Sequence, residues 1–145
     1  MYFYAKTNMF KDIYHNLVKI LLEQDGWVVT HDPLTIRGLT RKIHIDFAAE
    51  KIITAEREGS KIAVEVKSFL GPSLLNDFYD AIGKYELYWD ALNQNDPSRI
   101  LFIALPIGAY DELVLEPFIQ NTLRRLGIKL LIFNPALEKI ELWIP

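Results

Sequence analysis

The chain has 145 residues, enough for one domain whose core needs no disulfide or structural metal, and its lack of cysteine excludes thiol catalysis and Cys-ligated zinc. A formal net charge of −3 argues against a stand-alone DNA-binding module, because such modules meet phosphates with Lys and Arg. No stretch reaches the roughly 18 apolar residues of a membrane helix, and the start lacks the pattern of a signal peptide, so we expect a cytoplasmic protein without a membrane segment.

The first half of the chain is predicted to form one helix followed by short strands. Asn8 is expected to cap a helix that runs to about Asp25, because apolar residues recur there at helical spacing and Gly26 follows as a stop. Alternating apolar residues and turn signals then indicate strands or strand-like segments at 27–30, 34–37, 42–48, 51–57 and 61–70. A turn at residues 58–60 suits a hairpin between the last two segments.

The second half alternates helices with strands. Pro72 is well placed to begin a helix that extends to about Leu92. A second helix is expected from Asp111 to Leu126, with a bend at Pro117 and a stop at Gly127. Apolar runs indicate strands at 99–105, 129–133 and 139–143. The sequence therefore predicts a single α/β domain over residues 1–145, in which a mixed sheet is flanked by helices.

The strand KIAVEVKSFL (residues 61–70) carries an acid and a base on one face, Glu65 and Lys67. One interpretation is a half-buried strand whose polar face meets water. The other is a site shared with Asp46, which lies 19 positions earlier on a strand that a hairpin brings to the same sheet. Two carboxylates suit Mg²⁺, and a lysine beside them can orient water or stabilise charge on a phosphate. This combination favours metal-assisted phosphodiester hydrolysis.

The residues Ile45-Asp46 and Glu65-Val66-Lys67 resemble the motif of the PD-(D/E)xK nuclease superfamily. The resemblance implies a restriction-endonuclease-like fold, with Asp46 and Glu65 as Mg²⁺ ligands and Lys67 as a further catalytic residue. The chain departs from the motif at Ile45, where the superfamily pattern has proline. Many relatives also place a glutamate on the first helix, whereas His15, Asn16 and Lys19 occupy that stretch here and Glu23 lies near its end, so this ligand is unassigned.

Four further residues are candidates for accessory roles. His44 shares a strand face with Asp46 and would contact phosphate or transfer a proton, although a strand histidine is more often held by a neighbour. Glu50 would be a third oxygen ligand if a bulge turned it inward, and otherwise it is exposed. Lys84 and Tyr88 match the spacing of a Gln-x-x-x-Tyr pattern in one branch of the superfamily, with lysine in place of glutamine. A solvated helix face is the alternative for both.

A closer resemblance covers nearly the whole chain. The runs DGWVVTHDPLTIR (25–37), KIAVEVKSFLGPS (61–73) and EPFIQ (116–120) are similar to the XisH family, the fdxN-element excision controlling factors. Members of this family are implicated in programmed excision of a DNA element, together with a site-specific recombinase and the companion protein XisI. The resemblance implies an accessory factor that either retains a Mg²⁺-dependent nuclease site or uses an inactive nuclease fold to bind XisI or the recombinase.

Contact with DNA or with a second copy of the chain rests on limited sequence features. The basic residues are scattered, and Arg37, Arg41 and Lys42 form the one loose group in the first half. Any contact with nucleic acid would therefore need local positive potential, a metal ion or a partner. The final stretch IELWIP (140–145) is apolar enough to form a homodimer interface, and a terminal edge strand explains it equally well.

Overall fold

The computed structural model describes residues 2–37, 41–51 and 59–145 of the chain. The helical segments in chain order are α1 (Tyr2–Gln24), α2 (Leu74–Asn95), α3 (Ile107–Ala109), the π-helical turn η1 (Tyr110–Val114) and α4 (Pro117–Leu126). The strands are β1 (Val28–His31), β2 (Leu34–Ile36), β3 (Ile43–Ile45), β4 (Phe47–Lys51), β5 (Ser60–Val66), β6 (Ile100–Pro106), β7 (Leu130–Asn134) and β8 (Lys139–Ile144). In the part of the chain that the structure describes, no helix is long and apolar enough to cross a membrane.

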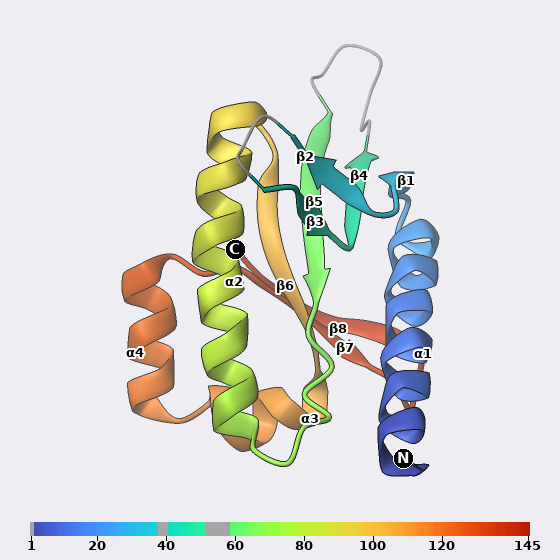
Figure 1. The fold of residues 1–145 in the computed structure, drawn as a ribbon, viewed down its shortest axis with the longest axis vertical. Coiled ribbons are helices and arrows are strands. Elements are labelled where there is room, and N and C mark those ends of the chain that lie inside the picture. Colours follow the sequence, from blue (N-terminus) through green and yellow to red (C-terminus); the bar gives the residue numbers. More distant parts are fainter. Residues whose placement is uncertain (1, 38–40, 52–58) are drawn as a thin grey trace.

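Six strands form one mixed sheet in the order β1-β4-β5-β6-β7-β8. The three central strands β5, β6 and β7 run parallel, and the pairings toward both edges are antiparallel. Helix α1 packs on one face, whereas α2 and α4 cover the other (Figure 1). This arrangement confirms the predicted mixed α/β domain with a sheet between helices.

Strand β5 is buried on both faces of the sheet. Ile62 and Val64 belong to the core beneath α1, and Ala63 belongs to the core beneath α2. Glu65 points to the α2 side and is only 8% exposed. The interpretation of this strand as half-buried with a wet polar face is therefore wrong, because α2 covers the face that carries Glu65.

The predicted strand at 42–48 is divided into two strands at Asp46. Its first part is β3, which pairs with β2 in a separate two-stranded hairpin, and its second part is β4, which joins the main sheet beside β5. The apolar positions alternate on both sides of the division, so the sequence pattern does not mark it. Most of the strand predicted at 51–57 lies outside the described residues, and the hairpin partner of β5 is β4.

The predicted helices differ from the observed ones mainly at their ends. Helix α1 begins at Tyr2 and not at Asn8, because no Gly or Pro interrupts the residues before Asn8. Helix α2 begins at Leu74, where the Ser73 side chain accepts a hydrogen bond from the Asn76 N–H. The helix predicted over 111–126 is divided, and Pro117 begins α4 instead of bending a longer helix, because proline suits a first turn that needs no N–H donor.

The C-terminal stretch forms β8, an edge strand of the sheet. Its Trp143 ring packs edge-on against Phe102, with ring centroids 5.0 Å apart. The strand interpretation of IELWIP is therefore confirmed, and a homodimer through this edge stays a prediction.

Candidate active site

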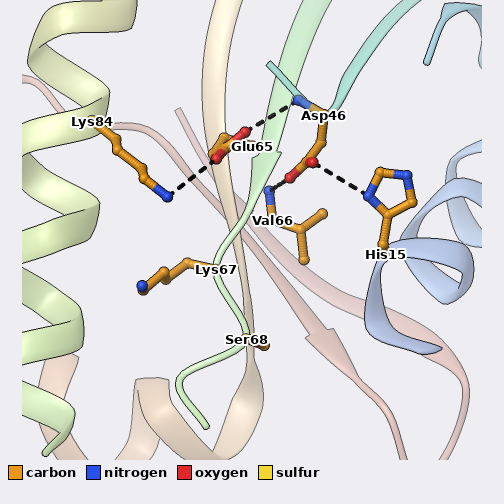
Figure 2. Close-up of a pocket in the computed structure, with 7 residues that line it drawn as sticks. All are labelled: His15, Asp46, Glu65, Val66, Lys67, Ser68 and Lys84. Atoms are coloured by element: carbon orange, nitrogen blue, oxygen red, sulfur yellow. Dashed lines mark hydrogen bonds and ion pairs between the residues drawn. The ribbon is translucent and has the colours of Figure 1, made fainter. Parts of the chain in front are cut away.

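A cavity of about 360 Å³ lies where β5 ends and the chain leaves the sheet. Four parts of the fold line it: α1, the β3–β4 junction, β5 with the segment after it, and α2. Figure 2 shows the lining residues His15, Asp46, Glu65, Val66, Lys67, Ser68 and Lys84. The structure thus brings the three residues of the predicted motif to one cavity.

The two carboxylates are fixed by a reciprocal pair of backbone hydrogen bonds. The Asp46 N–H donates to Glu65 Oε1 at 3.1 Å, and the Val66 N–H donates to Asp46 Oδ2 at 2.8 Å. The bend between β3 and β4 makes this possible, since it frees the Asp46 N–H from either sheet. One oxygen of each carboxylate is therefore used to hold the site together.

The second oxygen of each carboxylate faces a cationic or titratable side chain across the cavity. Asp46 Oδ1 lies 3.3 Å from His15 Nδ1, and Glu65 Oε2 lies 3.9 Å from Lys84 Nζ (Figure 2). Both carboxylates line the cavity. These two oxygens are the atoms that would bind a cation shared by both carboxylates.

The surroundings of Glu65 disfavour its ionised form. Burial first and the negative charge of Asp46 second raise its pKa from 4.5 to about 8, against the hydrogen bond from the Asp46 backbone and the attraction of Lys84. A divalent cation between the two carboxylates would remove this repulsion. The electrostatics of the pair therefore favour cation binding.

The donor set fits Mg²⁺ bound with water better than a closed protein cage. Among the residues that the structure describes, no group of three or more His, Cys, Asp or Glu side chains is arranged to hold a metal. Mg²⁺ commonly uses one or two carboxylates and keeps several waters, and the cavity has room for them. Asp46 and Glu65 would hold the ion.

His15 and Asp32 belong to the site but were not predicted as functional residues. His15 Nε2 lies 3.0 Å from Asp32 Oδ1, and Lys19 Nζ donates to Asp32 Oδ2 at 3.0 Å. Burial raises the pKa of Asp32, but the bonds from Lys19 and His15 outweigh it and hold that pKa below its usual value. The His15 ring also packs on Phe47, with ring centroids 4.3 Å apart. His15 lies in the stretch of the first helix where the sequence left a metal ligand unassigned. Its position on that helix was therefore the one sequence feature that could have identified it as a residue of the site.

Lys67 lines the cavity, but its ammonium group is turned toward α2 (Figure 2). Lys67 Nζ donates to Asp80 Oδ2 at 2.7 Å and lies 3.8 Å from Asp77 Oδ1. Asp80 Oδ2 also lies 3.4 Å from Lys84 Nζ, so one carboxylate bridges the two lysines. The hydrogen bond from Lys67 is the main reason that the pKa of Asp80 is lowered.

Asp77 ties the segment after β5 to α2. Its Oδ2 accepts the Gly71 N–H at 3.0 Å, and a Cβ on Gly71 would lie only 2.9 Å from Asp77 Oδ1. A glycine at this position therefore lets the carboxylate approach the backbone. This contact fixes the segment that carries Lys67.

The four accessory candidates lie in different places. Lys84 lines the cavity, whereas Tyr88 is half-buried nearby and its pKa is raised to about 12 by burial first and then by the charge of Glu65. His44 is exposed on the β2–β3 hairpin and pairs with Thr35 Oγ1 at 2.9 Å. The bulge that would have turned Glu50 into the cavity does not occur, and Glu50 Oε1 instead accepts a hydrogen bond from the buried Arg99 at 3.3 Å. His44 and Glu50 therefore lie outside the cavity.

Comparison with known proteins relates nearly the whole chain to one family. A family model described as XisH protein matches residues 9–141. The crystal structure of an XisH family protein from Nostoc punctiforme is similar, with 39% identity, a TM-score of 0.81, and coverage of 92% of this chain and 99% of that chain. A fdxN element excision controlling factor protein from Anabaena variabilis has 36% identity, a TM-score of 0.82, and the same two coverages. Comparison with curated proteins found no match.

Proposed function

The chain belongs to the XisH family, and on this premise we propose that it is an accessory factor for the excision of a DNA element, with a Mg²⁺-dependent phosphodiesterase site of the PD-(D/E)xK type. The similarity to the fdxN element excision controlling factor protein from Anabaena variabilis supports the first part. The second part depends on the cavity.

One observation carries the proposed activity: two carboxylates and two lysines from separate elements converge on a single cavity. Asp46 and Glu65 both line this cavity. The negative charge of Asp46 makes ionisation of Glu65 less favourable, and a cation bound between them would remove this repulsion. A structural ion-pair network would not require a nearly buried carboxylate, Glu65, to lie beside a second carboxylate, Asp46. A cation site explains the arrangement.

The residues of this chain have separate roles in the proposed reaction. A bound Mg²⁺ would supply Lewis acidity and activate water for attack on phosphorus. Asp46 and Glu65 bind the ion, and their backbone hydrogen bonds keep them in place. Lys84 lies beside Glu65, whereas Lys67 reaches the phosphate or the attacking water only after exchanging its bond to Asp80 for one to substrate.

We predict that Lys67→Ala lowers Mg²⁺-dependent cleavage of plasmid DNA by about 100-fold, because it removes a cation that stabilises charge on the phosphate. Folding should change little, since the Asp80 partner of Lys67 is about half-exposed and ion pairs open to solvent contribute little stability. Nicking and linearisation on agarose gels measure the rate. Lys61→Ala is the matched control, because Lys61 pairs with Asp96 far along β5 from the cavity. Equal rates for wild type and Lys67→Ala would contradict the role of Lys67.

A second candidate function is a catalytically inactive nuclease fold that binds an XisI-like protein or the recombinase. Two observations favour it: Lys67 is paired with Asp80, and in the described part of the chain no three His, Cys, Asp or Glu side chains are grouped so that they could hold a metal. We predict for this case a stable complex with XisI in EDTA that is unchanged by Asp46→Asn. Size-exclusion chromatography with light scattering measures it. Wild-type cleavage that requires Mg²⁺ would rule out the inactive fold.

A further inference from the structure

The β2–β3 hairpin has one apolar face and one polar face. Its register pairs Leu34 with Ile45, Thr35 with His44 and Ile36 with Ile43. The side chains of Ile36 and Ile45 are buried in the core that α2 covers. The hairpin is therefore seated firmly on the domain, and Figure 1 shows it beside α2 and in front of β5. Its other face is left toward solvent.

This outer face is cationic. Thr35 and His44 are joined across it by a 2.9 Å hydrogen bond, and strand alternation places Arg37 and Lys42 on the same side. Arg37, Lys42 and the neighbouring Arg41 are all exposed. None of these three forms an ion pair with any carboxylate whose side chain the structure describes. Residues 33–45 include no acid, in a chain with net charge −3.

Both ends of the hairpin begin at the candidate active site. Asp46 follows β3 directly, and Asp32, which contacts His15, lies two residues before the start of β2. Lys42 is four residues from Asp46, a reach of at most about 13 Å along an extended strand. This reach corresponds to the rise of roughly four base pairs along the axis of duplex DNA. A phosphodiester held in the cavity would therefore have neighbouring phosphates within reach of the hairpin.

We propose that the outer face of the β2–β3 hairpin, which carries Arg37 and Lys42 with the exposed Arg41 beside them, binds the sugar-phosphate backbone of duplex DNA next to the cavity. This inference rests on the proposed function and identifies how an acidic protein holds its substrate. The hairpin has no Phe, Tyr or Trp in residues 33–45. Proteins that hold single strands commonly stack bases on such side chains, so the surface fits the backbone of a duplex.

The test compares two triple variants that change the charge equally. One is Arg37→Gln/Arg41→Gln/Lys42→Gln, and the other changes Arg124, Arg125 and Lys139 to Gln at exposed positions of α4 and β8. Binding of a fluorescein-labelled 20-bp duplex is measured by anisotropy in EDTA between 50 and 200 mM salt. Three lost phosphate contacts should reduce the slope of log K against log salt by about 2.7. At the lowest salt, the affinity of the hairpin variant should fall at least about 10-fold. The control should stay within about twofold of wild type.

Three results would overturn the inference: an unchanged salt slope in the hairpin variant, an equal loss in the control, or tighter binding of a 20-nucleotide single strand or RNA than of the duplex. The variants leave the buried face of the hairpin intact, and thermal unfolding followed by circular dichroism verifies this. Mg²⁺ titration of the same hairpin variant separates the two claims. If the hairpin variant binds Mg²⁺ normally but no longer binds DNA, the hairpin is the DNA contact. If only Asp46→Asn loses DNA binding, the contact lies in the cavity and the proposed role of the hairpin is wrong.

Discussion

Asp46→Asn is expected to lower Mg²⁺-dependent DNA cleavage by at least about 100-fold, because it removes one of the two charges that bind the ion. The amide oxygen of Asn can still accept the Val66 N–H that Asp46 Oδ2 accepts at 2.8 Å, so the bend between β3 and β4 should be kept. The rate is measured on supercoiled plasmid over a Mg²⁺ series. An effect on the metal requirement as well as on the rate would identify Asp46 as a ligand.

Asp90→Asn is the matched control for this experiment. Asp90 is exposed on α2, and the substitution makes the same chemical change away from the cavity. We expect its cleavage rate to equal that of wild type. If Asp46→Asn cleaves as fast as Asp90→Asn, the cavity is not the site of hydrolysis.

Glu65→Gln is expected to remove a large part of the pH dependence of stability. The folded-state pKa of Glu65 is about 8, above its ordinary value of 4.5, so the unfolded chain releases this proton first as pH rises. The group therefore favours the folded state fully below pH 4.5, and this stability is lost as pH rises toward and through 8. The shift corresponds to about 5 kcal/mol as an upper limit. Gln keeps an oxygen for the Asp46 N–H and carries no charge.

Urea unfolding at pH 5, 7 and 9 measures this effect. The free energy of unfolding of wild type should fall by a few kcal/mol more than that of Glu65→Gln across this range. Glu86→Gln, an exposed substitution on α2, should follow wild type. Added Mg²⁺ should stabilise wild type at pH 9 and leave Glu65→Gln nearly unchanged, since a ligand that binds only the folded state raises its stability. Parallel curves for wild type and Glu65→Gln would contradict the pKa assigned to Glu65.

The pairing of Asp46 with Glu65 was predictable because the sequence places both residues on one sheet through a hairpin, and Asp46 does directly precede β4, the strand that pairs with β5. Strand alternation and the E-x-K spacing placed Glu65 on a definite face. The sequence did not indicate that this face is buried, since it is covered by α2, the helix that connects β5 to the parallel strand β6. The alternation of residues shows which side chains share a face of a strand, but it does not show which other element covers that face.

The bend at Asp46 and the contact with His15 could not be predicted from local pattern. Residues 42–48 alternate like one strand, although the chain passes from the hairpin to the main sheet in the middle. The distance of 3.3 Å between His15 and Asp46 depends on how α1 lies on the sheet, which is decided by packing between distant segments. The direction of Lys67 likewise depends on Asp80, a residue of the next helix.

Isothermal titration calorimetry of Mg²⁺ and Mn²⁺ binding tests the central claim most directly, with wild type, Asp46→Asn, Glu65→Gln and Asp90→Asn compared at pH 8. We expect wild type and Asp90→Asn to bind the ion, and the other two variants not to bind it. Binding should release protons, because Glu65 must ionise. Absence of binding in wild type, or equal binding in all four proteins, would contradict a metal site at Asp46 and Glu65.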